Sequence, residues 1–389
     1  MLPHRLQQKL EQRQQDQALR SLAAANELID FSSNDYLGFA RDHQLQTLTK
    51  SLLEQAQLER NGATGSRLLS GNHQLYPETE AIIAQHHGAE AALIFNSGYD
   101  ANLGFFQSVP QRNEVILYDE LVHASIRDGL QLSQAKAYKF RHNDLNHLEE
   151  LMLRNTASDE RDHVVYVVTE SVFSMDGDQP DLKFMANLVG RYNALLVVDE
   201  AHAFGVIGED GKGLVADQNL EDQVFARLIT FGKSLGSHGA AILGSADLKR
   251  YLVNFARSLI YTTGLPPHTV AQIQAAYVLL QKTDSSKKTL SPVRLLQARI
   301  SFFLQEIKRL HLLSHFISST SAIHCLTLPG NAEVSALSRK LKQQGFDVRP
   351  ILAPTVPKGQ ERLRFCLHSF NSEAEITKVL THLKAFLDN

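Results

Sequence analysis

The chain has 389 residues, of which 43% are hydrophobic and 21% charged, and its formal net charge is -3. That length is typical of a large domain with a smaller one, and the weak net charge creates no field that would recruit nucleic acid or an anionic membrane. The two cysteines, Cys325 and Cys366, are too few for a disulfide framework or a thiolate metal site. We expect no secretory signal in the Gln-rich residues 1–20, and no apolar run reaches the ~20 residues that span a bilayer. The composition thus favours a cytoplasmic protein with no membrane, nucleic-acid or metal partner.

The N-terminal part of the chain predicts short elements separated by polar turns. Residues 4–20 predict a weakly amphipathic helix that needs another surface to pack on. Residues 28–38 predict a short strand and a turn rich in Ser, Asn and Asp. Residues 61–72 hold three glycines, which indicates a loop whose backbone closely approaches something else. A helix is expected from Pro77 to Gly88.

From residue 91 onwards, apolar strands alternate with helical segments. The strands are expected at residues 91–95, 115–118, 164–169, 194–198 and 228–230, with helices after Tyr99 and from His123. Runs that are apolar on both faces are typical of parallel strands covered by helices. The alternation predicts an α/β fold with a mainly parallel central sheet sandwiched by helices.

The pattern changes after residue 268. A helix is expected from Pro292, and residues 362–367 alternate, with Arg362 and Arg364 on one face. We expect that face to be solvated, and two arginines on it also hint at an anion site. A capping box, Ser372 with Glu375, opens the last helix. This part predicts a smaller α+β C-terminal domain with a half-exposed sheet. The expected domains are an N-terminal helix and arm (1–40), a large α/β domain (41–268) and the C-terminal domain (269–389).

A lysine follows the strand at 228–230, in the sequence Gly232-Lys233-Ser234. A phosphate-binding loop would need a glycine five positions before Gly232, and Arg227 stands there, so a nucleotide-binding loop is excluded. Two interpretations remain. Lys233 is either a surface lysine in a turn or an amine nucleophile that forms a Schiff base.

Ligands of doubly wound sheets collect at the carboxyl ends of the strands. Three other predicted strands end in polar residues: Asp199 opens Asp-Glu-Ala-His, Gly98 and Tyr99 lie in a turn before a helix, and Glu170 follows Thr169. Each residue type also has a structural explanation, such as a helix cap or a turn former. A helicase-type box at Asp199 would need the upstream phosphate loop that is missing.

Together these residues suit pyridoxal phosphate. The aldehyde needs a lysine amine, and a buried carboxylate keeps the pyridine nitrogen protonated so that the ring draws electrons. Backbone N–H groups at a helix start bind the phosphate, and an imidazole can stack on the ring. The combination predicts an enzyme that uses this cofactor.

The motifs carry a family resemblance that runs nearly end to end. They are Ser33-Asn34-Asp35-Tyr36-Leu37-Gly38, Gly65-Ser66-Arg67, His123-Ala124-Ser125, Phe173-Ser174-Met175-Asp176-Gly177-Asp178, Asp199-Glu200-Ala201-His202, Thr230-Phe231-Gly232-Lys233 and Arg362-Leu363-Arg364. The chain resembles the α-oxoamine synthases, which are fold-type I pyridoxal phosphate enzymes with an aminotransferase-like fold. It departs from many members at Ala203-Phe204, where they carry Gly-Thr.

The resemblance implies a role for each matching residue. Lys233 forms the Schiff base and moves the substrate Cα proton, Asp199 pairs with the pyridine nitrogen, and His123 stacks on the ring. The further cofactor contacts that it implies are Gly98, Tyr99, Ser174, His202 and Thr230. The substrate contacts that it implies are Arg20, Asn34, Thr355 and Arg364, with Arg364 on the amino-acid carboxylate. Thr262 and Thr263 would reach the phosphate of a partner subunit.

The implied activity is that of a pyridoxal phosphate-dependent acyltransferase. It would condense L-alanine with a pimeloyl thioester, of coenzyme A or of an acyl-carrier protein, with loss of carbon dioxide, in a homodimer with a shared active site. The same chemistry with glycine and acetyl-, succinyl- or palmitoyl-CoA is an open alternative. A regulator or inactive homologue that retains the cofactor is another, although the presence of Lys233, Asp199 and His123 argues against it.

Overall fold

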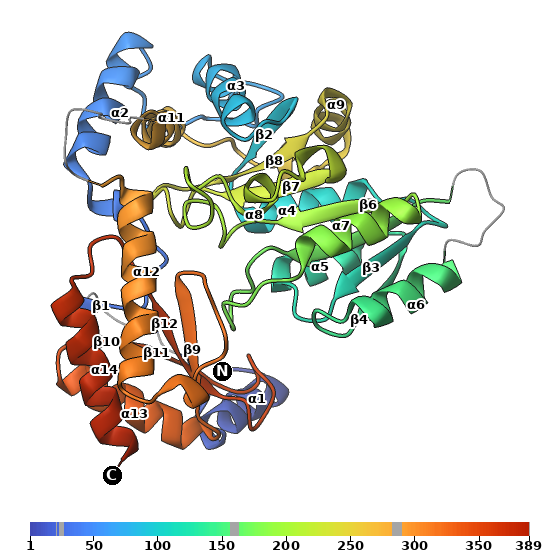
Figure 1. Ribbon diagram of the computed structural model, residues 1–389. Coiled ribbons are helices and arrows are strands. Elements are labelled where there is room, and N and C mark those ends of the chain that lie inside the picture. Colours follow the sequence, from blue (N-terminus) through green and yellow to red (C-terminus); the bar gives the residue numbers. More distant parts are fainter. Residues whose placement is uncertain (21, 23–26, 156–162, 282–289, 389) are drawn as a thin grey trace. The chain divides into compact units, whose positions relative to one another are not determined.

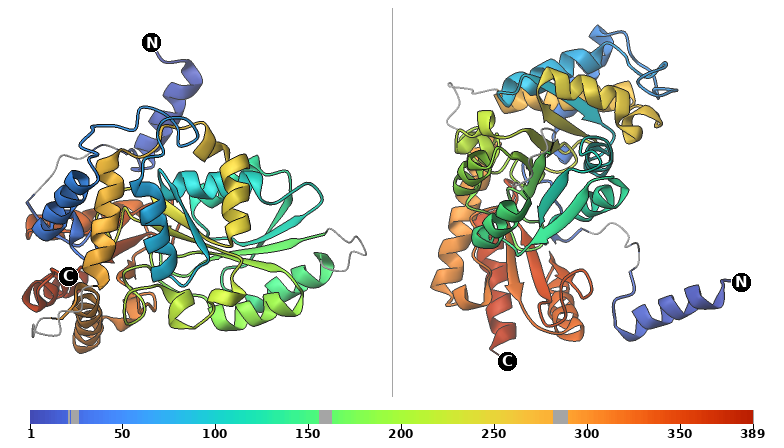
Figure 2. Two further views of the ribbon diagram at one scale, coloured as in Figure 1. Left: turned by 90° about the horizontal axis from the view of Figure 1, so that it is seen from above. Right: turned by 90° about the vertical axis from the view of Figure 1, so that its right-hand side faces the viewer.

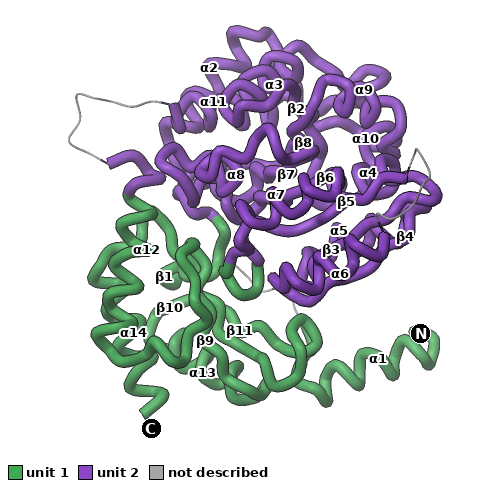
Figure 3. Tube along the Cα trace, turned by 45° about the vertical axis from the view of Figure 1, so that its right-hand side comes forward, with its two compact units in different colours: residues 1–34, 174–178, 295–389 green, residues 35–173, 179–294 purple. Residues whose placement is uncertain are grey.

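The computed structural model describes residues 1–20, 22, 27–155, 163–281 and 290–388 (Figure 1). Backbone contacts divide the chain into two compact units, coloured separately in Figure 3. Unit 1 comprises residues 1–34, 174–178 and 295–389, and unit 2 comprises residues 35–173 and 179–294. The domain boundaries expected from the sequence describe parts that fold independently. A division of the chain by contacts does not test independent folding, so these boundaries stay a prediction. None of the helices within the described ranges is long and apolar enough to cross a bilayer.

Unit 2 is built around a seven-stranded sheet with the strand order β2-β8-β7-β6-β5-β3-β4. The strands are β2 (Ala91–Phe95), β3 (Val115–Asp119), β4 (Lys136–Phe140), β5 (Val165–Glu170), β6 (Leu195–Asp199), β7 (Ala226–Thr230) and β8 (Ala240–Gly244). β8 pairs antiparallel with β2 and β7, and the pairings of β3 with β4 and β5, of β5 with β6 and of β6 with β7 are parallel. Figure 2 shows this sheet and its helices from two other sides.

Helices flank the sheet, as the alternating pattern predicts. They are α2 (His43–Gln55), α3 (Leu75–His86), α4 (Gly98–Ser108), α5 (Ala124–Leu132), α6 (Leu145–Asn155), α7 (Leu182–Arg191), α8 (Leu214–Asp217), α9 (Ala246–Phe255), α10 (Arg257–Ile260) and α11 (Pro267–Gln281), with short 3-10 turns at Phe39–Arg41 and Glu221–Gln223. Every residue of β5 and β7 is buried, so side chains on both faces of these strands are covered. Burial on both faces explains the continuous apolar runs and confirms the expected α/β fold.

Unit 1 contains a three-stranded antiparallel sheet, β11-β12-β9, and a parallel pair, β1-β10. The strands are β1 (Ile29–Asp30), β9 (Ile323–Thr327), β10 (Phe346–Asp347), β11 (Arg349–Ile351) and β12 (Arg362–Cys366), and the helices are α1 (His4–Gln15), α12 (Pro292–Arg309, from Leu295 in this unit), α13 (Asn331–Gln343) and α14 (Glu373–Leu387), with a 3-10 turn at Leu313–His315. The capping box of Ser372 and Glu375 is confirmed at the start of α14. α1 confirms the predicted N-terminal helix but is shorter than expected and buries none of its residues.

The expectation that β12 has a solvated face is wrong. Arg362 and Arg364 are only 4% and 9% exposed, because residues 174–178 of the same unit lie over that face. Arg362 forms an ion pair with Asp176, and Arg364 donates to the carbonyl of Ser174 at 2.8 Å. Strand alternation alone could not reveal a covering segment that lies almost two hundred residues away in the sequence. The predicted start of α3 at Pro77 is also two residues late, since the helix begins at Leu75.

Candidate active site

Four strands of unit 2 end in polar side chains at one edge of the sheet. Asp119, Glu170, Asp199 and Thr230 are the last residues of the parallel strands β3, β5, β6 and β7. Parallel neighbours end at the same edge, so these groups gather where the sheet opens. Lys233 follows Thr230 by three residues and therefore lies at that edge too.

The turn that carries Lys233 is tightly braced. The backbone N–H of Phe231 donates to the carbonyl of Gly239 at 2.9 Å, and the hydroxyl of Thr230 donates to the same carbonyl at 3.1 Å. The hydroxyl of Ser234 donates to the carbonyl of Phe204. Gly236 has φ 55°, and a Cβ there would lie 2.1 Å from the nitrogen of Ala40, so only glycine fits. The lysine therefore projects from a fixed backbone.

Asp199 is buried and receives two hydrogen bonds. The amide Nδ2 of Asn102 donates to its Oδ2 at 2.9 Å, and the backbone N–H of Ala201 donates to its Oδ1 at 2.9 Å. Both donors fix the orientation of the carboxylate. A buried, oriented carboxylate is suited to hold a protonated ring nitrogen.

His123 caps α5 and lies in the same electrostatic environment. Its Nδ1 accepts from the backbone N–H of Ser125 at 3.2 Å. Partial removal of the ring from water lowers the pKa of His123; the negative charge of Asp199 opposes this shift and the positive charge of Lys233 adds to it. Because Asp199 and Lys233 both act on one imidazole, the structure brings these three residues together.

Glu170 lies between the histidine and the aspartate. Its Oε1 accepts the backbone N–H of His123 at 2.6 Å, and it pairs in the sheet with Asp199. Burial and the neighbouring charge of Asp199 raise the pKa of Glu170 well above its ordinary value, although Lys233 opposes this. The carboxyl group thus supports the backbone at His123.

His202 is also buried near the edge. The hydroxyl of Tyr36 lies 2.7 Å from its Nδ1. Tyr36 is completely buried, so the ring of His202 is held by a rigid partner.

The start of α4 provides the anion-binding geometry that the sequence predicts. Ser97 caps the helix by accepting the backbone N–H of Asp100 at 3.0 Å. A Cβ on Gly98 would lie 3.8 Å from the hydroxyl of Thr230, so the helix N-terminus lies beside the end of β7. Positive dipole ends of helices favour phosphate.

Two other predicted groups occur near this turn. The ring of Tyr99 is 44% exposed, and its hydroxyl donates to Asp128. The amide Nδ2 of Asn96 donates to the hydroxyl of Thr262 at 3.2 Å and to the carbonyl of Thr263 at 2.6 Å. Both threonines thus lie against the turn before α4 of their own chain.

The remaining predicted residues belong to unit 1 and form two clusters there. Arg364 donates to Asn34 at 3.1 Å as well as to the carbonyl of Ser174. Arg20 donates to the hydroxyl of Thr355 at 3.3 Å. The arginine that was expected to bind a carboxylate is therefore a buried, oriented group.

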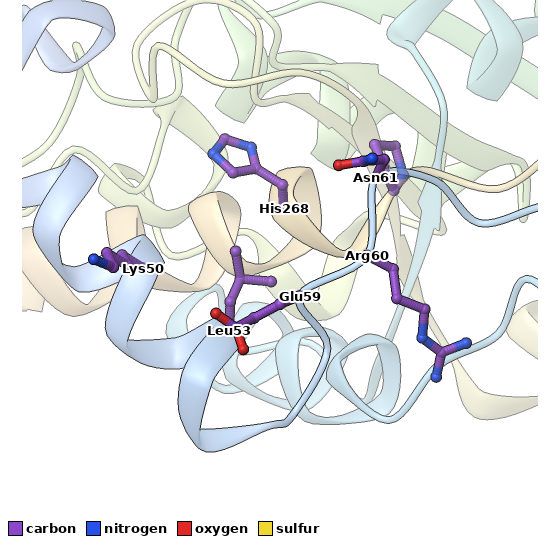
Figure 4. A pocket seen from close by; sticks show the side chains of 7 residues that line it. Lys50, Leu53, Glu59, Arg60, Asn61 and His268 are labelled. Carbon is purple, nitrogen blue, oxygen red and sulfur yellow. The ribbon is translucent and has the colours of Figure 1, made fainter.

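A shallow pocket of about 480 Å³ lies elsewhere in unit 2 (Figure 4). It is lined by Lys50, Leu53, Glu59, Arg60, Asn61, Pro266 and His268. None of the predicted site residues lines it. We therefore assign it no part in the proposed reaction.

Four residues at the site received no role from the sequence: Asn102, Ser125, Glu170 and Tyr36. The available signal was weak for each. Asn102 is a polar residue on the apolar face of α4, and such a residue must find a buried partner. Only the packed structure shows which partner it has.

The comparisons with known proteins agree with this geometry. The family model of aminotransferase class I and II matches residues 26–383. The chain belongs to this family of enzymes, and the resemblance and fold expected from the sequence are confirmed.

Individual relatives and solved structures narrow the similarity to particular enzymes. The chain is 40% identical over 375 residues to 8-amino-7-oxononanoate synthase of Emericella nidulans, with 92% of this chain and 89% of that protein covered. A crystal structure of 8-amino-7-oxononanoate synthase from Francisella tularensis matches with a TM-score of 0.76 at 27% identity, covering 94% of this chain and 99% of that chain. A structure of SPT with its PLP internal aldimine matches with a TM-score of 0.83 at 28% identity, covering 92% of this chain and 87% of that chain.

Proposed function

We propose that the chain is an 8-amino-7-oxononanoate synthase, a pyridoxal phosphate-dependent acyltransferase of biotin biosynthesis. It condenses L-alanine with a pimeloyl thioester and releases carbon dioxide and the free thiol carrier. The observation that carries the proposal is that Asp199 ends β6 and Lys233 follows the end of β7, the parallel strand beside it, at the same edge of the sheet. Relatives of that name at 38–40% identity over most of the chain support it.

The donor set of unit 2 fits pyridoxal phosphate. The amine of Lys233 and the carboxylate of Asp199 supply the groups for the aldehyde and the pyridine nitrogen. Gly98 and Tyr99 at the start of α4, with Thr230, supply backbone and hydroxyl donors for the phosphate. Bound there, the cofactor supplies an electron sink for a carbanion at the amino-acid Cα.

The residues of the chain then have distinct tasks. Nζ of Lys233 takes the proton from Cα of L-alanine and later returns one to the product. Asp199 keeps the pyridine nitrogen protonated by ion pairing, since an opposite charge favours the charged form. His123 covers the ring face, and His202, oriented by Tyr36, binds the ring hydroxyl.

Unit 1 carries the residues to which the family resemblance assigns substrate contacts. The guanidinium of Arg364, oriented by Asn34 and the carbonyl of Ser174, binds the carboxylate of L-alanine. For Ser174 the family resemblance suggests a cofactor contact, and for Arg20 and Thr355, which are hydrogen-bonded to each other, contacts to the acyl substrate.

The active form is a homodimer with a shared site, in which Thr262 and Thr263 of one protomer reach the phosphate held by the other. Heterodimers that combine a Lys233→Ala protomer with a Thr262→Ala, Thr263→Ala protomer would test this, because sharing predicts one intact site per pair. The protein acts in the cytoplasm, a proposal supported by its two buried cysteines, neither of which forms a disulfide.

Carbon dioxide release tests the function directly. The protein with pyridoxal phosphate is given L-alanine, glycine or L-serine, each with pimeloyl, acetyl, succinyl and palmitoyl thioesters of coenzyme A or an acyl-carrier protein. The proposal predicts the highest kcat/KM for L-alanine with a pimeloyl thioester. A preference for glycine with acetyl-CoA would instead indicate 2-amino-3-ketobutyrate CoA ligase.

A further inference from the structure

A continuous chain of hydrogen bonds joins Asp199 to His123 through two side chains. Asn102 Nδ2 lies 2.9 Å from Asp199 Oδ2 and 3.0 Å from the hydroxyl of Ser125. The same hydroxyl lies 2.8 Å from Nδ1 of His123. The chain therefore connects a carboxylate on β6 with an imidazole at the start of α5 through one residue of α4.

The chemistry of its two ends fixes the direction of every bond. An ionised carboxylate only accepts, so Asn102 must turn its NH₂ group, and not its carbonyl, toward Asp199. The second hydrogen of that NH₂ group is donated to Ser125 Oγ. The backbone N–H of Ser125 donates to His123 Nδ1, which makes this nitrogen an acceptor, so the Ser125 hydroxyl donates its hydrogen to it as well. A nitrogen that accepts two hydrogens carries none itself.

The packing holds this arrangement in place. Asn102 and Ser125 are 4% and 1% exposed, so water does not compete for their hydrogen bonds. α4 and α5 approach closely at Gly129, where a Cβ would lie 3.0 Å from the carbonyl of Asn102 and 2.9 Å from Cβ of Phe106. Glu170 fixes the backbone of His123 from the sheet. Neither Asn102 nor Ser125 can turn without breaking buried hydrogen bonds.

We propose that Asn102 and Ser125 are positioning residues that hold His123 as a neutral imidazole protonated on Nε2 and tie its ring to the carboxylate of Asp199. The catalytic consequence rests on the proposed function. A neutral ring over the cofactor adds no positive charge that would oppose protonation of the pyridine nitrogen by Asp199. Nε2 offers a hydrogen rather than a lone pair, so His123 acts as a donor and leaves the role of base to Lys233.

The charged groups around His123 have competing effects. Those that act on its ring are Asp199, Lys233, Arg127 and Asp128, and Glu170 receives its backbone N–H. Partial desolvation lowers the pKa of the ring most, Lys233 and Arg127 lower it further, and the two aspartates raise it. This lowered pKa agrees with the neutral form that the hydrogen bonds require.

Nitrogen-15 spectra of the histidine rings test the tautomer. Full-length protein with labelled histidine is studied without and then with pyridoxal phosphate, and the His123 signals are assigned by their loss in His123→Gln. We expect the wild type to show the Nε2–H tautomer. Ser125→Ala and Asn102→Ala each weaken the bonds that stabilise the neutral form, so the pKa of His123 should rise by roughly 0.5–1 pH unit.

Two further variants separate positioning from packing. Ser125→Thr keeps a hydroxyl and should restore the wild-type tautomer and pKa. Ser108→Ala removes another buried hydroxyl, one on α4 that donates to the carbonyl of Gly104, and should change neither. If Ser125→Ala does not fold, Asn102→Ala tests the same series of hydrogen bonds, because it removes the donor to both Ser125 and Asp199.

The pH profile of carbon dioxide release gives the second measurement. In Ser125→Ala, the acidic decline of activity should move to higher pH by the same shift as the pKa of His123. An Nδ1–H tautomer in the wild type, or spectra unchanged in both alanine variants, would overturn the inference. A protein that shows the expected spectra and turns over none of the thioesters would contradict the proposed function while leaving the inference intact.

Discussion

The seven-stranded sheet of unit 2 and the three-stranded sheet of unit 1 carry functional side chains in different ways. In unit 2, the chemistry lies at the ends of parallel strands, where Glu170, Asp199 and Thr230 are each the last residue of their strand. In unit 1, it lies on the face of an antiparallel strand, where Arg364 is buried beneath residues 174–178. The end of a strand faces the edge of the sheet, where a ligand can reach its side chain. A strand face becomes a site only when another segment covers and orients it.

The difference shows what holds each site. Asp199 is placed by the end of its own strand and by the backbone N–H of Ala201 two residues on, with one further hydrogen bond from Asn102 of α4. Arg364 depends on Asn34 and Ser174, which come from distant parts of the chain. We therefore expect substitutions in unit 2 to impair the chemical step and those in unit 1 to impair substrate binding.

Asp199→Asn should have the largest effect. It removes the negative charge that stabilises the protonated pyridine, and we expect kcat to fall by at least ~10²-fold, the scale for losing one oriented electrostatic group. Asp42→Asn is a control away from the sheet edge, because Asp42 caps α2 by accepting the backbone N–H of Leu45 at 2.8 Å and asparagine caps helices about as well. Steady-state kinetics and the visible spectrum of the bound cofactor should be altered in the first variant only.

Arg364→Met should act on binding. Loss of a charged donor to the L-alanine carboxylate should raise KM for L-alanine by about tenfold with a smaller change in kcat. Arg362→Met removes the neighbouring buried arginine, whose partner is Asp176. That variant should cost about 3 kcal/mol of unfolding free energy without a selective change in KM. Equal KM values for L-alanine in Arg364→Met and Arg362→Met would contradict the separate roles of these two arginines.

Glu170 tests the support beneath His123. Glu170→Ala leaves the backbone N–H of His123 without its acceptor and should lower the free energy of unfolding by about 1–2 kcal/mol. Glu170→Gln keeps a neutral acceptor and should be close to wild type at low pH. The raised pKa of Glu170 favours folding below its ordinary value of 4.5, and this contribution is lost as pH rises. Unfolding measured from pH 4 upward should therefore show Glu170→Gln becoming the more stable protein.

The smallest expected effect is on stability at acidic pH, and it comes from one buried histidine in each unit. Burial lowers the pKa of His86 in unit 2 to about 4 and that of His324 in unit 1 to about 3, from an ordinary 6.5. Each contributes stability that is complete above pH 6.5 and is lost as pH falls, because the unfolded chain takes up the proton first. His86→Phe and His324→Phe should each lower the midpoint of acid unfolding, whereas His43→Phe, at an exposed position, should not. An unchanged midpoint in both buried variants would contradict this assignment.

The sequence predicts the strand-end part of the site well, and the physical reason is locality. An apolar run followed by Asp199, or by Gly232-Lys233, marks a strand and its end without reference to the rest of the chain. The family resemblance added roles for residues such as Arg364 and Ser174, and these roles stay predictions.

Neither the burial of Arg364 nor the hydrogen bonds that link Asp199, Asn102, Ser125 and His123 could be predicted in the same way. Both depend on segments that only the folded chain brings together: residues 174–178 over β12, and α4 against α5 at Gly129. Alternation in a strand indicates which residues share a face. It does not indicate whether another segment covers that face.

The most direct test of the central claim is to locate the covalent bond between protein and cofactor. The full-length protein is saturated with pyridoxal phosphate, reduced with borohydride and digested, and the pyridoxyl-bearing peptide is identified by mass spectrometry. The account predicts the modification on Lys233, unchanged by Lys183→Ala and absent from Lys233→Ala. A modification on another lysine, or a reducible adduct that persists in Lys233→Ala, would contradict it.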